Sequence, residues 1–328
     1  MKLFKLLTGA GLTLIAAAAV HAADPYPSKP VTMLVPYPAG GLSDAIARIA
    51  SPALGKNLGQ TAVVENLGGA SGSIAAQKVL TAASDGYTLF QGSPNEVILA
   101  PLAMTGVKYK AEDFRLVQMI GVSQLVMIVR GDLPVKTIDD VVALARSAPK
   151  DKPLTYGSVG IGSFYHVLGE HMAQTIGASM THVPYKGIAP LIQDLSGNHG
   201  VDIALLPYSK TFAGLAEQGK LKILGTLAAE RPEQLKQLPT VNEGKTLKDF
   251  NFNIWTGYMV KKDTPEDIVQ SLHKALTATL SDSEVRSKLE AQSLMVAKPL
   301  SLADAAKAFE AETANFRAIA KSIKLEAQ

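Results

Sequence analysis

The chain has 328 residues, of which 47% are hydrophobic and 19% are charged, and it contains no cysteine. Lysine and arginine number 32 against 29 for aspartate and glutamate, so the formal net charge is only +3. This is the composition of a globular protein long enough for two lobes, and it excludes disulfides, thiol nucleophiles, iron–sulfur clusters and cysteine-based zinc sites. The nearly balanced charge argues against nucleic acid as a partner.

The first 22 residues have the three zones of a secretory signal peptide. Lys2 and Lys5 form a short basic region, Leu6 to Val20 is apolar, and small residues precede a predicted cleavage after Ala22. A membrane anchor is the weaker interpretation, because the apolar run is shorter than a bilayer span of roughly 20 residues. No later stretch approaches that length without interruption. We therefore expect an exported, soluble protein of the periplasm.

Strand and helix patterns then alternate to the end of the chain, which predicts an α/β fold with mainly parallel sheets flanked by helices. Pro52 falls inside the first helical pattern and is expected to bend or break it, because proline cannot donate the hydrogen bond to the preceding turn. A long apolar run, 116–129, marks the passage from the first lobe to the second. The predicted strands are 31–35, 61–65, 87–91, 116–129, 154–158, 180–183, 201–206, 221–227 and 250–260, and the helices begin at or span Ser43, 73–83, Thr137, 164–176, 188–195, 211–218 and the segment after Thr264.

Glycine-rich loops follow three of these strands and lead into helices. The loop 36–41 precedes Ser43, 68–72 precedes a second helix, and 157–163 precedes Phe164. A helix N-terminus offers unpaired backbone N–H groups and partial positive charge, and glycine lets a ligand approach the backbone closely. The first and third loops therefore fit an anion site that needs no basic side chain. Each loop alone also fits an ordinary tight turn, which is the simpler interpretation of 68–72.

Catalytic and metal motifs are not evident. His166 and His171 are five residues apart, which does not match the i,i+4 spacing of a helical metal motif. The sequence has no nucleophile elbow, no nucleotide-binding P-loop and no complete dinucleotide fingerprint. Asp44 could be a catalytic carboxylate, but bracing the glycine loop is the more economical role. We expect no cofactor and no bound metal.

The residues also resemble a known family. The segments that carry the resemblance are 26–44, 64–72, 85–89, 156–163 and 182–187, with Trp255 and Thr264-Pro265. In the same order along the chain, they are similar to segments of the Bug-type solute-binding proteins, the periplasmic receptors of tripartite tricarboxylate transporters. The resemblance spans essentially the whole chain after the signal peptide. It implies a two-lobed periplasmic binding protein, type II-like, that captures a small organic carboxylate and delivers it to integral membrane transporter subunits.

The resemblance also implies where the ligand binds. Carboxylates in this family are held between the two glycine loops, largely by backbone groups and ordered water. Carried over by position, the first lobe would contribute Tyr37, Ala39, Gly40, Gly41, Ser43, Asp44 and Ser93, and the second Ser158, Gly160, Gly162, Ser163, His166 and Tyr185. The loop 94–96 departs from many members and is expected to influence selectivity. There, Glu96 is interpreted mainly as a solvent-facing side chain, and alternatively as a group favouring a ligand amine or amide.

We expect the lobes to be discontinuous, with residues 23–124 and 253–328 in the first and 125–252 in the second. The segments 123–126 and 252–256 would cross between them and act as the hinge, so Trp255 should report ligand binding. Nothing in the sequence indicates an obligate oligomer, and we expect a monomer. Two alternatives stay open: a receptor that signals to a sensor kinase, and a periplasmic enzyme.

Overall fold

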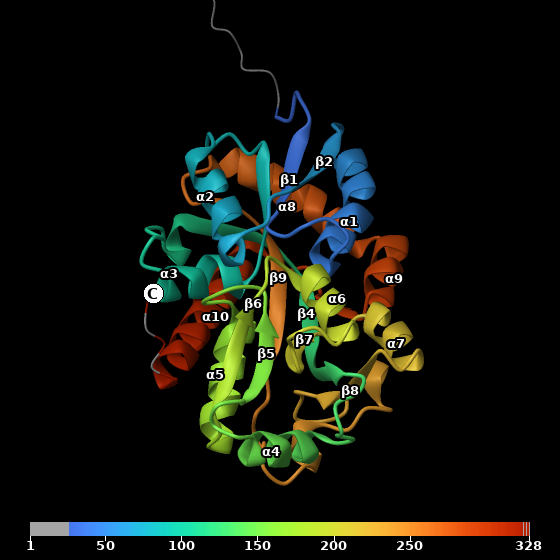
Figure 1. The fold of residues 1–328 in the computed structure, drawn as a ribbon. Helices are drawn as coiled ribbons and strands as arrows, with labels where there is room; N and C mark the ends of the chain where they lie inside the picture. The colour runs from blue at the N-terminus through green and yellow to red at the C-terminus, as the bar shows by residue number, and fades with distance from the viewer. Residues whose placement is uncertain (1–25, 324, 326, 328) are drawn as a thin grey trace, which may run out of the picture.

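The computed structural model describes residues 26–323, 325 and 327 (Figure 1). The predicted signal peptide therefore lies outside the described residues. Strands and helices alternate along the chain, and the two halves of the molecule in Figure 1 each contain a sheet covered by helices. No helix within the described residues is long and apolar enough to cross a membrane.

The elements follow the predicted order closely. The strands are β1 (Val31–Val35), β2 (Ala62–Asn66), β3 (Thr88–Gly92), β4 (Phe114–Arg130), β5 (Leu154–Ser158), β6 (Met180–Pro184), β7 (Ile203–Pro207), β8 (Leu221–Thr226), β9 (Asn253–Lys261) and β10 (Leu294–Val296). The α-helices are α1 (Leu42–Leu58), α2 (Ser73–Thr81), α3 (Ala100–Ala103), α4 (Ile138–Ser147), α5 (Phe164–Ile176), α6 (Ile188–Ser196), α7 (Lys210–Glu217), α8 (Glu266–Ser281), α9 (Ser283–Ala291) and α10 (Leu302–Ser322). Short helical turns are η1 (Ala70–Gly72), η2 (Asn95–Leu99), η3 (Ala111–Asp113), η4 (Glu233–Leu235) and η5 (Val241–Glu243).

One half of the molecule is built on the strand order β2-β1-β3-β9-β4. Alternate residues of β1 point to opposite faces of this sheet. Met33 packs with Ile46 of α1 on one face, and Leu34 packs with Val79 of α2 on the other. Because both faces are covered by helices, β1 is an almost continuous apolar run, as expected for a buried parallel strand.

Strand β4 continues from this sheet into the second one. Its residues up to Gln124 pair with β9, whereas Leu125 and the residues after it pair with β7 and β8. The second sheet continues from β7 through β5 to β6. Strands β4 and β9 therefore connect the two halves (Figure 1). The cleft between the halves lies where these two paired strands pass from one half to the other.

The sheets are mixed. The outer strands β1, β2 and β3, and likewise β5, β6 and β7, pair in parallel as the strand–helix alternation predicts. Every antiparallel pair involves β4 or β9. These two crossing strands pair with each other in opposite directions, so they cannot both run parallel to the outer strands. The expectation of mainly parallel sheets thus holds for the outer strands only.

Helix α1 also differs from the sequence prediction. It continues from Leu42 to Leu58 with Pro52 inside it, so Pro52 does not end the helix. The helix is held by its buried face, which includes Ala50 and Leu54 on either side of the proline. Tertiary packing of an apolar face commonly outweighs a local helix-breaking preference.

Candidate functional site

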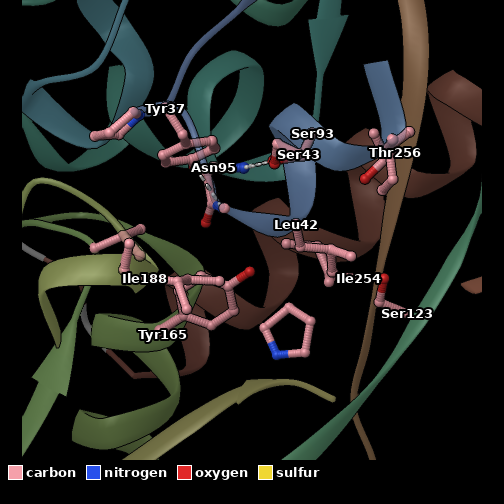
Figure 2. A pocket seen from close by; sticks show the side chains of 16 residues that line it. Tyr37, Leu42, Ser43, Ser93, Asn95, Ser123, Tyr165, Ile188, Ile254 and Thr256 are labelled. Carbon is pink, nitrogen blue, oxygen red and sulfur yellow. Dashed lines mark hydrogen bonds between the residues drawn. The ribbon is translucent and has the colours of Figure 1, made fainter. Parts of the chain in front are cut away.

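A cavity lies between the two halves, beside the neighbouring strands β4 and β9 (Figure 2). The loop after β1, the start of α1, the π-turn η2 and the start of α6 surround it. Its lining residues are Tyr37, Pro38, Gly41, Leu42, Ser43, Ile46, Ser93, Asn95, Ser123, Val159, Tyr165, Ile188, Ala189, Pro207, Ile254 and Thr256.

Two helices, one from each half, begin at this cavity. Gly41 precedes α1 and Gly187 precedes α6, and no side chain caps either helix. The first N–H groups of a helix have no acceptor within it and carry partial positive charge. Pro38 packs over Gly187, where an added Cβ would come within 3.0 Å of the proline Cδ. This close contact brings the two uncapped helix starts together across the cleft.

The cavity contains no charged side chain among its lining residues. Its polar side chains are hydroxyls and one amide, contributed by Tyr37, Ser43, Ser93, Asn95, Ser123, Tyr165 and Thr256. Its apolar side chains include Leu42, Ile188 and Ile254, which face the same space in Figure 2. Such a cavity can hold a small molecule with an anionic group at the helix starts and a short apolar body beside the isoleucines.

The loop between β1 and α1 is held by Asp44. The backbone N–H of Gly40 donates to Asp44 Oδ2 at 2.9 Å, and Arg48 Nε donates to Asp44 Oδ1 at 2.9 Å. Burial alone would raise the pKa of Asp44, but the hydrogen bonds from Arg48 and Gly40 outweigh it and lower that pKa. Asp44 therefore holds the loop before α1 in place. Gly40 lines an adjoining hollow that also opens between α1 and α6.

The second glycine loop, 157–163, closes onto the other half of the molecule. Ser71 Oγ donates to the carbonyl of Ile161 at 2.6 Å. A Cβ on Gly160 would meet Ser71 Oγ at 2.6 Å, and one on Gly162 would meet Ala103 Cβ at 2.3 Å. Both glycines have positive φ values. Their lack of a side chain thus permits close contact between the halves, and of this loop only Val159 lines the cavity.

The start of α5 differs from those of α1 and α6, because side chains accept from two of its first N–H groups. Ser163 Oγ accepts from the N–H of His166 at 3.3 Å, and Asn95 Oδ1 accepts from the N–H of Phe164 at 2.6 Å. His166 Nδ1 accepts from the N–H of Gly162 at 3.1 Å. This helix start therefore binds the other half of the molecule through Asn95.

Two histidines stack beneath the same loop. The rings of His166 and His182 are 4.0 Å apart, and His182 Nε2 lies 2.6 Å from Ser158 Oγ. Burial lowers the pKa of His166, and burial together with His166 lowers that of His182 to about 4. Both imidazoles are therefore neutral near pH 7, which leaves His166 Nδ1 free to accept the Gly162 bond.

The structure thus divides the residues predicted for the site. Tyr37, Gly41, Ser43 and Ser93 line the cavity. The loop 157–163 is held by Ser158, Ser163, His166 and its glycines Gly160 and Gly162. Tyr185 lies outside the cavity lining and donates to Asp194 Oδ2 at 2.9 Å. Ala39, Gly40 and Asp44 form or hold the loop before α1. Within the described residues, no three histidine, aspartate or glutamate side chains gather as a metal site.

Several cavity residues were not predicted from the sequence. Asn95 and Tyr165 both line it, and Asn95 also donates through Nδ2 to the Tyr37 hydroxyl at 3.0 Å. The segment Asn95–Leu99 forms one π-turn, which carries Asn95 to the cleft. The same turn buries Glu96 completely, so the expectation of a solvent-facing Glu96 is wrong. The only sequence signal was the unusual loop 94–96.

Two strands join the two halves, and the cavity between the halves has no charged lining side chain and receives one helix start from each half. This arrangement defines a two-lobed solute-binding protein. Residues 46–325 match the family model described as the tripartite tricarboxylate transporter family receptor. The chain belongs to this family.

Individual proteins agree with that assignment. A UPF0065 protein of Agrobacterium vitis, from the TAR-I ttuE-ttuC' intergenic region, is 35% identical over 265 residues, covering 81% of this chain and 75% of the relative. The structure of the periplasmic binding protein BugD superposes with a TM-score of 0.84 at 28% identity, covering 92% of this chain and 100% of BugD. The structure of R. palustris Rpa4515 with adipate gives a TM-score of 0.83 at 30% identity, covering 92% and 100%.

Proposed function

We propose that this protein captures a small organic carboxylate between its lobes and delivers it to the membrane subunits of a tripartite tricarboxylate transporter. Membership of the receptor family supports this role, and so does the adipate bound to the similar protein Rpa4515. Binding would produce a closed complex and leave the ligand chemically unchanged, since the family is one of receptors.

The observation that carries the proposal is the meeting of two uncapped helix starts at one cavity without charged side chains. A carboxylate transferred from water must recover its hydrogen bonds, or the transfer is strongly unfavourable. N–H groups at the starts of α1 and α6 can supply them, with hydroxyls and bridging waters completing the shell. Because the two helices belong to different lobes, an anion held by both would favour the closed arrangement.

The predicted site residues enter this proposal in two roles. We propose that Tyr37, Gly41, Ser43 and Ser93 contact the ligand, together with Asn95 and Tyr165. The remaining predicted residues would hold the two loops in place, and they are Ala39, Gly40, Asp44, Ser158, Gly160, Gly162, Ser163, His166 and Tyr185.

We further propose that residues 23–124 with 253–328 move as one lobe and 125–252 as the other. The change of sheet along β4 after Gln124, and the start of β9 at Asn253, support this division. Export to the periplasm by a signal peptide cleaved after Ala22, and function as a monomer, complete the proposal.

A thermal-shift panel tests the function directly. The panel contains dicarboxylates, tricarboxylates, aromatic acids and amino acids, each added separately. A ligand present at 100 times its Kd should raise the free energy of unfolding by about 2.7 kcal/mol. The matched control for adipate is adipamide, which has the same carbon chain without charge and should give no shift. A panel in which no acid raises the melting temperature contradicts the proposal.

A further inference from the structure

Glu96 is a fully buried carboxyl directly behind the cavity. Its Oε2 accepts two hydrogen bonds from Ser93, one from the backbone N–H and one from the hydroxyl, both at 2.7 Å. Its Oε1 is buried and has no hydrogen-bond partner among the described residues. Gly72, in a left-handed conformation, makes room for the side chain, since a Cβ there would lie 2.3 Å from Glu96 Cγ. Glu96 thus occupies a closed compartment and contacts two residues that line the cavity, Ser93 and Tyr37.

Among the residues that the structure describes, no opposite charge compensates Glu96. The titratable groups facing it are the tyrosines Tyr37 from the loop before α1, Tyr109 from the loop after α3, and Tyr165 from α5. The hydroxyl of Tyr109 donates to the Glu96 carbonyl at 2.6 Å, not to its carboxyl.

The other elements packed on η2 do not supply a cation either. The basic side chains Lys78 of α2 and Arg317 of α10 are largely exposed and pair with Glu65 and Glu112. The buried residues of α10 are apolar apart from Thr313, and the turns η1 and α3 contain no charged residue. Burial therefore raises the pKa of Glu96 to about 7.

The protonation state of Glu96 decides what Ser93 can offer to a ligand. When Glu96 is ionised, the Ser93 hydroxyl hydrogen is directed to Oε2, and the hydroxyl oxygen accepts from the backbone N–H of Asn95 at 3.3 Å, so Ser93 has no hydrogen left to donate to a ligand. An incoming carboxylate then finds no donor at the Ser93 hydroxyl and a negative charge behind it. When Oε1 holds a proton, the negative charge is lost and Oε2 becomes a weaker acceptor that still holds the backbone N–H of Ser93, so the hydroxyl can turn and donate to the anionic ligand instead.

We propose that Glu96 couples carboxylate capture to proton uptake: the protein binds its anionic ligand with Glu96 protonated, and affinity falls as Glu96 ionises. This inference rests on the proposed function. Glu96 acts here as a positioning residue, since it directs the Ser93 hydroxyl and does not line the cavity.

Calorimetric titration with adipate, or with the panel acid that binds best, tests the coupling between pH 6.5 and 8.5. Carboxyl groups of such acids are ionised throughout this range. We expect the Kd of the wild-type protein to rise by about 25-fold across it, as expected for one linked proton on a group whose pKa is about 7. Glu96→Gln keeps the side-chain shape and an acceptor for Ser93 but cannot ionise, so its Kd should stay constant.

A second measurement counts the protons. Titrations at pH 8 in two buffers of different ionisation enthalpy should show an uptake approaching one proton per wild-type complex, and none for Glu96→Gln. Glu312→Gln is the matched control, because burial also raises the pKa of Glu312 but this residue lies on α10 away from the cavity. It should behave as the wild type.

The outcomes separate the two proposals. A wild-type Kd that stays constant over the range, or an equal pH slope in Glu96→Gln, overturns the coupling while leaving the carboxylate receptor intact. Absence of binding by every acid at every pH overturns both.

Discussion

The backbone N–H of Phe164 donates to the side-chain oxygen of Asn95 at 2.6 Å, and this bond joins the two lobes beside the cavity. The same amide donates through Nδ2 to the Tyr37 hydroxyl at 3.0 Å. Asn95 is 1% exposed, so both bonds form away from solvent. One side chain thus links the start of α5, the loop before α1 and the cavity wall.

Asn95→Ala should weaken ligand binding by about tenfold while the protein stays folded. Closure would bury the Phe164 N–H without an acceptor, which costs about 1–3 kcal/mol in the closed state only. Calorimetry against the best panel acid measures the change. Asn242→Ala is a matched control, because Asn242 also makes two side-chain hydrogen bonds, with Ala229 and Asp249, but lies outside the cavity. Equal affinities of the two variants would contradict this role for Asn95.

Gly162→Ala should impair closure. Gly162 and Gly177 both have left-handed φ values, of 73° and 64°, so alanine strains the backbone similarly at either position. An added Cβ at Gly162 would lie 2.3 Å from Ala103 Cβ across the cleft, whereas at Gly177 it would meet nothing within 4 Å.

Both alanine variants should therefore lose similar stability, but only Gly162→Ala should lose affinity and keep a larger radius of gyration when the acid is added. Small-angle scattering with and without ligand measures this. A Gly162→Ala protein that binds and compacts like Gly177→Ala would show that the contact with Ala103 does not limit closure.

Trp255 fluorescence should change on ligand binding. Trp255 is the only tryptophan in the sequence, it is 2% exposed, and its ring lies edge-on to Phe309 at 6.0 Å. Its neighbours in β9, Ile254 and Thr256, line the cavity. The intensity change should saturate with the Kd that calorimetry gives and disappear in Trp255→Phe. An unchanged spectrum at saturating ligand would place the movement away from β9.

The stability of the ligand-free protein should depend on Glu96. Its pKa is about 7 when folded and about 4.5 in an unfolded chain, so the folded state holds the proton more tightly. The contribution of Glu96 to the free energy of unfolding is therefore greatest below about pH 4.5 and falls by about 3 kcal/mol as the pH rises to about 7.

Glu96→Gln should lack that decrease, and urea unfolding of both proteins between pH 5 and 8 measures the difference. The absolute stabilities can differ because the variant changes the bonds to Ser93, so the comparison uses the slopes. Parallel curves would show that Glu96 is already ionised within the folded protein at pH 5.

Periodicity and turn residues predicted most of the secondary structure. The bounds of β1, β5 and α5 match the predicted ranges, because apolar runs and helix-start residues are local signals. The length of β4 was also visible, since Phe114–Arg130 is apolar on both sides of Gly121.

The site was less predictable, because facing the cavity depends on packing between the lobes. The glycine loop before α5 looked like the second anion-binding loop, yet Asn95 and Ser71 engage it. The start of α6 faces the cavity instead, although only Gly187 marks it. Burial of Glu96 follows from a π-turn, which has no local pattern in the sequence.

The proposed binding mode has the backbone N–H groups of α1 and α6 hold one carboxylate together. Amide chemical shifts of isotope-labelled protein report on each helix start separately. They are followed while the acid that binds most tightly in the panel is added. We predict that the amides of Leu42, Ser43, Ile188 and Ala189 shift most among the helical residues and share one Kd. Large shifts confined to one of the two helix starts, or found at neither, would show that the two helices do not share the carboxylate.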